Sequence, residues 1–324
     1  MKVLVTGGAG FIGSNLVESL LKEEHVSLVR VVDNFATGSR ANINEFGSDP
    51  KFEFIEADIR DYDACLKFCE GIDVISHQAA LGSVPRSIKD PLTTNAVNIT
   101  GTLNVFTAAK EQGVKRVVFA ASSSTYGDHP GLPKVEHLIG NPLSPYAVTK
   151  YVNELYARVY ADLYSLDYVG LRYFNIFGPK QNPMGPYAAV IPLFAEAVIK
   201  GEPPTINGDG SYSRDFTFVA NAVLANKLAL FSTNKEALNQ VYNIACGEQT
   251  SLLQLFDFLV EEDGKDLRPI HGPERRGDVK HSLADISKAA KLLGYQPLIT
   301  VSEGLKQTLA WYRRQIGSSV TEGK

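Results

Sequence analysis

The chain has 324 residues, 44% of them hydrophobic, and a formal net charge of −4. It is long enough to bury a large core and to form two lobes. Because it has no basic stripe and no apolar run of about 18 residues, we expect it to bind neither nucleic acid nor a membrane. Three cysteines and the lack of a signal-peptide pattern favour the cytoplasm.

An apolar strand at residues 2–6 runs directly into a glycine-rich turn, after which a helical pattern begins. Glycines in such a turn let the backbone approach a pyrophosphate, and the following helix presents amide donors and the positive end of its dipole. The segment therefore predicts a dinucleotide site. The turn residues that we expect to contact the cofactor are Gly7, Gly10, Phe11, Ile12 and Gly13.

The next strand, at residues 28–32, ends at Asp33, twenty positions beyond Gly13. An acidic side chain at this place accepts hydrogen bonds from the adenosine ribose and repels a 2′-phosphate. We therefore expect NAD rather than NADP as the cofactor. Arg40 lies close by in the sequence and keeps NADP open as an alternative.

Strands are also expected at 52–56, 74–77, 116–121 and 168–173, alternating with helices near 62–70, 92–112 and 145–165. This alternation predicts an α/β fold with a doubly wound parallel sheet, in which ligands bind beyond the carboxyl ends of the strands. Cys65 and Cys69 share one helix face without a second pair nearby, so we expect buried small residues and no metal site.

Tyr146 and Lys150 are four residues apart, which places them on one face of the predicted helix. A tyrosine hydroxyl titrates near ~10 in isolation, and an adjacent ammonium favours the phenolate. The pair can therefore form a base. The spacing alone is also compatible with an ordinary surface pair, and it is the glycine turn that favours catalysis.

With these motifs and the serines that follow strand 116–121, the chain resembles the extended short-chain dehydrogenase/reductase family, and more narrowly its nucleotide-sugar 4-epimerases. The resemblance spans Val3 to about Trp311. It implies a Rossmann-type fold, tightly bound NAD, a UDP-sugar substrate, and a homodimer that pairs through helices 92–112 and 145–165. The other cofactor-binding residues that we expect are Asn34, Thr37, Gly38, Asp58, Ile59, Gln78, Ala79, Ala80, Asn98 and Tyr173, besides Asp33, Tyr146 and Lys150.

The resemblance also implies how the chain divides and which residues catalyse. Residues 1–175 are expected to form the NAD-binding domain, with 215–245 returning to it, and 176–324 to form mainly a smaller, less regular substrate lobe. Tyr146 is the expected base and Lys150 lowers its pKa and holds the nicotinamide ribose. Ser122, four residues before the Tyr126-Gly127 pair, is expected to polarise the sugar O4.

By the same resemblance, Asn175, Arg214 and Arg275 hold the diphosphate and Asp278 meets the nucleoside. Arginine suits this role because its planar fork pairs with phosphate oxygens. The remaining residues expected around the sugar are Gly82, Ser83, Ser123, Ser124, Ala189, Val190 and Ser282, together with Ser122 and Tyr146.

Two features narrow the expected reaction. Related dehydratases place Asp and Glu directly after the catalytic hydroxyl residue, where this chain has Ser123 and Ser124, which cannot act as acid or base near neutral pH. Epimerisation at C4 therefore fits best. A small residue at the gate position, Ser282, resembles the subgroup that prefers UDP-N-acetylglucosamine and UDP-N-acetylgalactosamine. UDP-glucose and UDP-galactose, uronic acid forms, and another dehydratase, decarboxylase or reductase of the family stay open as alternatives.

Overall fold

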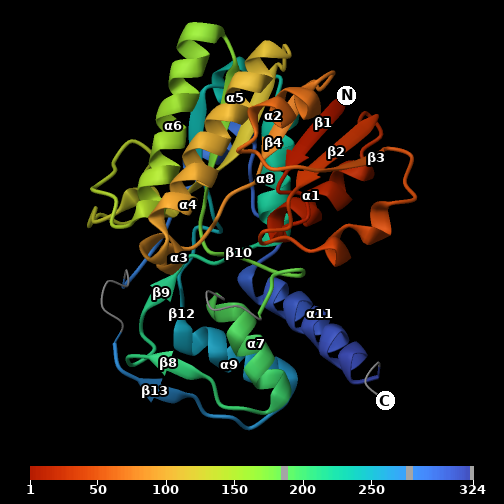
Figure 1. Ribbon diagram of the computed structural model, residues 1–324. Coiled ribbons are helices and arrows are strands. Elements are labelled where there is room, and N and C mark those ends of the chain that lie inside the picture. Colours follow the sequence, from red (N-terminus) through yellow and green to blue (C-terminus); the bar gives the residue numbers. More distant parts are fainter. Residues whose placement is uncertain (184–188, 275–279, 322–324) are drawn as a thin grey trace.

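The structure is a computed structural model that describes residues 1–183, 189–274 and 280–321. Seven parallel strands form its centre (Figure 1). In spatial order these are β11 (Gln240–Ile244), β6 (Asp167–Tyr173), β5 (Arg116–Ser122), β4 (Val74–His77), β1 (Lys2–Thr6), β2 (Leu28–Asp33) and β3 (Phe52–Glu56). The chain moves outward from β1 to β3 and then returns to β4, so the strand order reverses beside β1. The predicted doubly wound parallel sheet is confirmed, and this reversal is where ligands bind in such folds.

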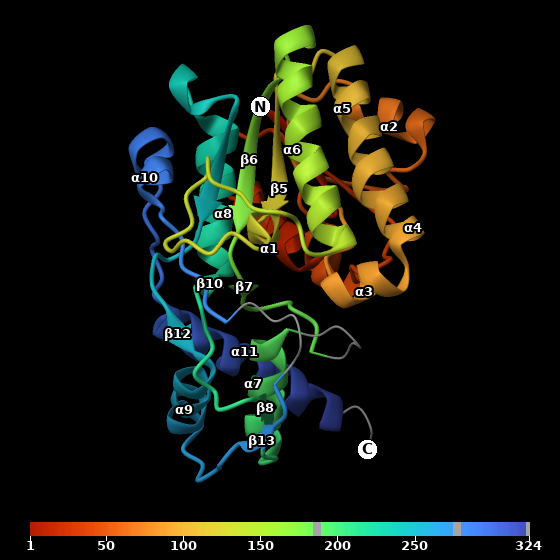
Figure 2. The same ribbon diagram turned by 90° about the vertical axis from the view of Figure 1, so that its left-hand side faces the viewer.

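Helices cover both faces of the sheet (Figure 2). On one face, α1 (Phe11–Leu21) and α8 (Val219–Phe231) share a core with Val3 and Val5 of β1. On the other face, α2 (Tyr62–Cys69), α5 (Thr102–Glu111) and α6 (Pro145–Tyr164) share a second core with Leu4. Side chains alternate between the two faces along a strand, which is why an unbroken apolar strand is buried on both sides.

The helix expected at 92–112 is three consecutive segments. It begins as α4 (Pro91–Asn95), continues as a π turn at Ala96–Gly101 and ends as α5. A Cβ on Gly101 would lie 2.6 Å from the side chain of Ile59, so glycine permits the close approach of the π turn to the segment that follows β3. π turns are frequent near functional sites. The short helix α3 (Val84–Lys89) precedes these three helical segments.

A second group of helices packs beneath the carboxyl ends of the strands (Figure 1). It comprises α7 (Val190–Lys200), α9 (Leu252–Asp263) and α11 (Val301–Thr321), whose buried side chains include Phe194, Leu255 and Leu305. Short strand pairs flank this group: β8 (Thr205–Asn207) with β13 (Ile270–Gly272), β9 (Ser213–Arg214) with β12 (Thr250–Ser251), and β7 (Ile176–Phe177) with β10 (Thr217–Phe218). Helix α10 (Ser287–Leu293) returns to β11 and α8.

The segment 215–245 contributes to both parts. Its β10 strand pairs with β7, whereas its α8 packs against α1 and its β11 extends the main sheet beside β6. Within the described ranges, no helix has both the length and the apolarity needed to cross a bilayer.

Candidate active site

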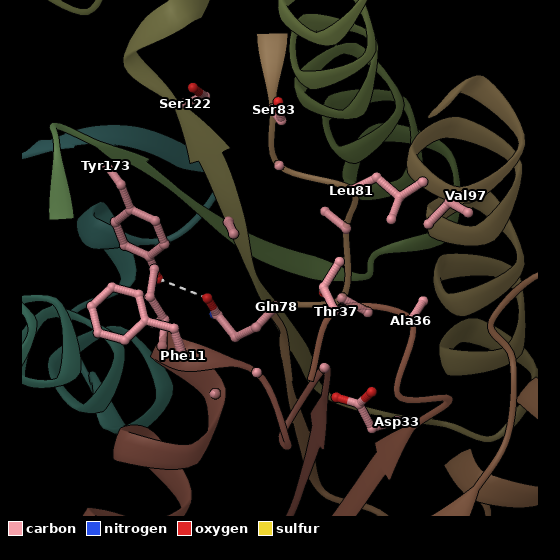
Figure 3. A pocket seen from close by; sticks show the side chains of 18 of the residues that line it. Phe11, Asp33, Ala36, Thr37, Gln78, Leu81, Ser83, Val97, Ser122 and Tyr173 are labelled. Carbon is pink, nitrogen blue, oxygen red and sulfur yellow. Dashed lines mark hydrogen bonds between the residues drawn. The ribbon is translucent and has the colours of Figure 1, made fainter. Parts of the chain in front are cut away.

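A cavity of about 780 Å³ opens at the carboxyl ends of the strands. Figure 3 shows Asp33, Ala36 and Thr37 towards one end of it, and Ser83 and Ser122 towards the other. Most of the residues predicted for cofactor or substrate line it. They are Gly7, Gly10, Phe11, Ile12, Gly13, Asp33, Asn34, Thr37, Asp58, Ile59, Gln78, Ala79, Ala80, Gly82, Ser83, Ser122, Ser123, Tyr146, Lys150, Tyr173, Asn175 and Ala189.

The glycine turn between β1 and α1 is packed too closely for side chains. Gly7 has φ +69°, and a Cβ there would lie 2.6 Å from the backbone nitrogen of Ala79. A Cβ on Gly13 would lie 2.1 Å from the carbonyl oxygen of Gly7. Helix α1 starts after Gly10 without a side-chain cap, so its first N–H groups remain available to an anion. The turn therefore fits a pyrophosphate.

Asp33 is positioned at the end of β2 by the glycine turn itself. Its carboxylate accepts hydrogen bonds from the backbone N–H groups of Ala9 at 3.0 Å and Phe35 at 2.8 Å. Burial raises its pKa, and these N–H groups oppose that rise. Arg40, which left NADP open, forms an ion pair with Glu56 and stacks 4.4 Å from the Phe35 ring centre, and it is absent from the described cavity lining. This arrangement favours a free ribose diol.

A second carboxylate, Asp58, lies at the end of β3. The side chain of Asn34 donates to it at 2.9 Å, and Arg60 donates at 2.6 Å. The hydrogen bond from Arg60 lowers the pKa of Asp58 to about 2, although burial opposes this. Asp58 is therefore an ionised acceptor at the same end of the cavity as Asp33.

Helix α6 delivers the tyrosine and the lysine. It begins with Pro145 after Ser144, whose side chain accepts a hydrogen bond from the Ala147 N–H at 3.1 Å, as an N-cap residue does. The Lys150 ammonium donates to the Ala120 carbonyl at 2.8 Å and lies 5.9 Å from the centre of the Tyr146 ring. Burial lowers the pKa of Lys150 to about 8.

The hydroxyl of Tyr146 meets Ser122 from the end of β5. Burial raises the pKa of Tyr146 above its ordinary value, and a hydrogen bond with Ser122 opposes part of that rise. Ser122 Oγ also accepts hydrogen bonds from the Ser124 N–H at 3.1 Å and the Ser124 hydroxyl at 2.8 Å. Since both of these bonds use Ser122 as the acceptor, its own proton is left to donate to an oxygen beside Tyr146.

Six predicted residues lie outside the described cavity lining. The Asn98 side chain accepts a hydrogen bond from the Leu81 N–H and donates to the Leu81 carbonyl and the Thr149 hydroxyl. A Cβ on Gly38 would contact Ala9, while Ser124 supports Ser122 and Val190 is the first residue of α7. Arg214 donates to the carbonyls of Ser213 and Lys280, and the Ser282 hydroxyl accepts from the Asp215 N–H at 3.3 Å. Arg275 and Asp278 lie outside the described residues.

The cavity is also lined by residues that sequence reasoning missed. They are Val32, Ala36, Ala57, Leu81, Arg86, Val97, Ala120, Ala121, Ile176, Gln181 and Asn182. Most are apolar neighbours of predicted residues. They line the cavity because they lie at strand ends, and no sequence motif marks them. Arg86 is different, because a cation one turn after Ser83 was a detectable signal. The backbone N–H of Arg86 donates to the Ser83 hydroxyl at 3.2 Å. Among the described residues, no cluster of three or more His, Cys, Asp or Glu side chains could hold a metal ion.

The parallel sheet, the glycine turn and the Ser122, Tyr146 and Lys150 group define an α/β enzyme that uses a dinucleotide for chemistry at a carbinol. The family model "NAD dependent epimerase/dehydratase family" matches residues 3–245. The chain belongs to this family, and its cofactor is NAD.

Comparisons with individual proteins agree with this assignment. A UDP-glucose 4-epimerase of Mycolicibacterium smegmatis is 38% identical over 317 residues, covering 97% of this chain and 99% of the relative. The structure of a UDP-N-acetylglucosamine 4-epimerase from Methanobrevibacter ruminantium in complex with UDP-N-acetylmuramic acid is 40% identical, with a TM-score of 0.91 and coverage of 97% and 98%. That of Thermus thermophilus UDP-glucose 4-epimerase in complex with NAD is 37% identical, with a TM-score of 0.85 and coverage of 97% and 99%.

Proposed function

We propose that the protein interconverts UDP-N-acetylglucosamine and UDP-N-acetylgalactosamine by epimerisation at C4. NAD, when bound in the cavity, would supply a reversible hydride acceptor for C4 of the sugar. Family membership and the similarity to 4-epimerases of nucleotide sugars support the reaction class. The small residues around the sugar end of the cavity support the N-acetylated substrate.

The chain's own groups provide the proton chemistry. Tyr146, as phenolate, accepts the proton of the 4-hydroxyl, and Ser122 donates its remaining hydrogen bond to the same oxygen. Lys150 keeps a positive charge near the phenolate and thereby favours its ionised form. Once the 4-keto sugar has formed, a half turn of the hexose presents its other face, and Tyr146 gives the proton back.

The two serines after Ser122 argue against dehydration. The Ser124 hydroxyl donates a hydrogen bond to Ser122, and Ser123 lines the cavity. Neither group can carry a proton to or from C5 and C6 near neutral pH, because a hydroxyl has no useful pKa in that range. The site thus offers one base and one hydride acceptor, which is what epimerisation needs.

The observation that carries the substrate proposal is the free space beside the catalytic group. A Cβ on Gly82 would meet no atom of the described residues within 4 Å, although Gly82 lines the cavity next to Ser83. Ala189, which also lines the cavity, contributes only a methyl group. Room next to the hexose is what a 2-acetamido group requires.

The reaction class is tested by two measurements on the purified protein. Denaturation should release NAD(H) although none was added, since a cofactor that is regenerated in each turnover need not leave. Incubation with UDP-N-acetylglucosamine should then yield UDP-N-acetylgalactosamine without added cofactor. A strict requirement for added NAD, with NADH accumulating, would instead identify a dehydrogenase.

The substrate is tested at Ser282. We predict that Ser282→Tyr lowers kcat/KM for the N-acetylated pair about 10- to 200-fold by steric exclusion, and spares or improves that for UDP-glucose and UDP-galactose. Ser282→Ala is the matched control, because it also removes the acceptor of the Asp215 N–H but adds no bulk. Equal losses on both pairs, or none on either, would place the gate elsewhere.

One observation favours a uronic acid as a second candidate substrate. Arg86 is among the residues that line the cavity and lies one turn after Ser83, which lies towards the Ser122 end (Figure 3). An arginine there can pair with a carboxylate at C6. Parallel assays with UDP-N-acetylglucosamine and its C6-oxidised form decide between the two, because a higher kcat/KM for the oxidised form would make it the preferred substrate.

A further inference from the structure

A buried ion pair joins the catalytic helix to the sheet. Arg172 of β6 donates to Glu154 of α6 through two parallel hydrogen bonds of 2.9 Å and 2.7 Å. The two side chains are only 4% and 7% exposed. The remaining guanidinium nitrogen donates to the Glu136 carbonyl at 3.0 Å, so each nitrogen of the fork has a partner.

The pair lies directly behind the catalytic group. Glu154 is four residues after Lys150 and eight after Tyr146, so the three side chains share one face of α6. In the sheet, Arg172 is paired with Ala121, and the next residue of β5 is Ser122. Figure 2 shows α6 alongside β5 and β6. The ion pair therefore joins α6, which carries Tyr146, to β6, the strand paired with the Ser122 strand β5.

The same guanidinium supports the turn after Ser122. Its central carbon lies 4.8 Å from the ring centre of Tyr126, the last residue of the turn Ser123–Tyr126. The hydroxyl of Tyr126 donates to the Asn243 side chain at 2.5 Å, which ties this turn to β11. Arg172 thus contacts both the helix of the base and the turn that holds Ser124 against Ser122.

Stability is a poor explanation for such a pair. Removing two charges from water costs about as much as their attraction returns, and apolar pairs of similar volume are often as stable or more so. What an ion pair offers instead is geometric specificity, because a bidentate arginine–carboxylate pair forms in only one relative orientation of the two side chains. Along the outer face of α6, Val148, Leu155 and Leu163 are exposed, so within this chain the helix is held by β5, β6 and the helices α3, α4 and α5.

We propose that Arg172 and Glu154 are positioning residues that hold the Tyr146 hydroxyl within hydrogen-bond reach of Ser122. Neither residue is part of the described cavity lining, so they act through the placement of α6 against β6 and its neighbour β5. Small displacements matter in this arrangement, because a shift of about 1 Å between catalytic groups can cost roughly 100-fold in rate. The kinetic part of this inference rests on the proposed epimerisation.

The decisive variant replaces both charges, Glu154→Met with Arg172→Met. We expect a melting temperature close to that of the wild type, since no charge is left unpaired. We also expect kcat to fall about 10- to 100-fold with unchanged KM and unchanged NAD content. If kcat recovers together with the melting temperature, the pair is merely structural and the inference is overturned.

A titration that needs no substrate gives an independent readout. The phenolate of Tyr146 is followed by ultraviolet difference spectra, with the Tyr146→Phe form of each protein as its reference. Because the Ser122 hydrogen bond lowers the pKa of Tyr146, the double variant should titrate at higher pH than the wild type. An unchanged titration overturns the inference, even if the wild type proves to act on a different sugar and the proposed function fails.

Two further variants keep the test sharp. If the double variant does not fold, Glu154→Gln replaces it, because it keeps the shape of the side chain. This variant should show the same fall in kcat and the same shift of the titration. If it shows neither, the inference is overturned. Asp263→Asn is the matched control, because it breaks an ion pair with Arg313 of 2.6 Å within the second helix group. It should leave kcat and the Tyr146 titration unchanged.

Discussion

At the scale of single residues, the chemistry depends on how three side chains divide the hydrogen bonds between them. Ser124 supplies donors to Ser122, so Ser122 is left as a donor towards the oxygen that reacts. The Lys150 ammonium is anchored to the Ala120 carbonyl, which keeps its positive charge near Tyr146. The charge acts on the phenolate through space, so the mechanism requires no hydrogen bond between the two side chains. The tyrosine then remains the group that accepts and returns the proton.

Replacement of that group gives the first residue-scale prediction. Tyr146→Phe should lower kcat by about 10²- to 10⁴-fold, the usual contribution of a general base, while NAD content and UDP-sugar binding stay unchanged. Steady-state kinetics and calorimetric binding measure this. The control is Tyr164→Phe at the exposed end of the same helix. Activity within about threefold of the wild type would remove Tyr146 from the mechanism.

At the scale of elements, one buried carboxylate connects β9, β11 and the segment that precedes α10. Asp215 is fully buried and accepts hydrogen bonds from the backbone N–H groups of Cys246 at 3.0 Å, Gly247 at 3.1 Å and Ala284 at 3.2 Å. Its own backbone bonds the side chains of Asn175 and Ser282. Asp215 therefore aligns the loops that we assign to the substrate.

This carboxylate predicts a pH dependence of stability. Burial raises the pKa of Asp215 to about 6, above its ordinary value of 3.8. Its stabilising contribution is therefore complete below the unfolded-state pKa and is lost as pH rises through about 6. The wild type should lose about 1 kcal/mol of unfolding free energy between about pH 5 and about pH 7 from this group alone.

Urea unfolding across this range, compared with Asp215→Asn, isolates the effect. The asparagine variant should be less stable at every pH, because its NH₂ group faces N–H donors, and the difference between the two proteins should shrink as pH rises. A constant difference would show that Asp215 does not titrate in this window.

At the scale of the whole molecule, an apolar surface is left on the outer side of the catalytic helix. Leu155, Val159 and Leu163 of α6 are exposed, and Leu92 of the neighbouring α4 is 82% exposed. Large exposed apolar patches mark interfaces in soluble proteins. We propose that a second copy of this chain covers it, so that α4 and α6 of two protomers pack together.

The prediction is a homodimer that charge on this face disrupts. The wild type should elute with the mass of two chains in size-exclusion chromatography with light scattering, and Leu155→Arg with Leu163→Arg should elute as one chain. Leu193→Arg, at an exposed leucine of α7, is the control and should remain dimeric. A monomeric wild type would contradict the proposal.

Local features of the chain were sufficient for the sheet and for the cofactor end of the cavity. The glycine turn needs residues without a Cβ at Gly7 and Gly13, and Asp33 follows at a spacing that one βαβ unit sets. Tyr146 and Lys150 share a helix face because of helical periodicity alone. All of these relations lie within one or two consecutive elements, so the sequence by itself determined them.

What only the tertiary structure decided are the relations between segments far apart in the chain. The pairing of Glu154 with Arg172, the bond from Asp215 to Ser282, and the entry of Arg86 into the cavity wall depend on how elements pack, and no spacing rule encodes this. The same holds for Arg40, whose nearness in sequence suggested a phosphate contact but whose charge is paired with Glu56 across β3. Contacts of this kind form only once burial has brought their elements together, because hydrophobic packing is non-directional and leaves polar partners to be chosen by the final geometry.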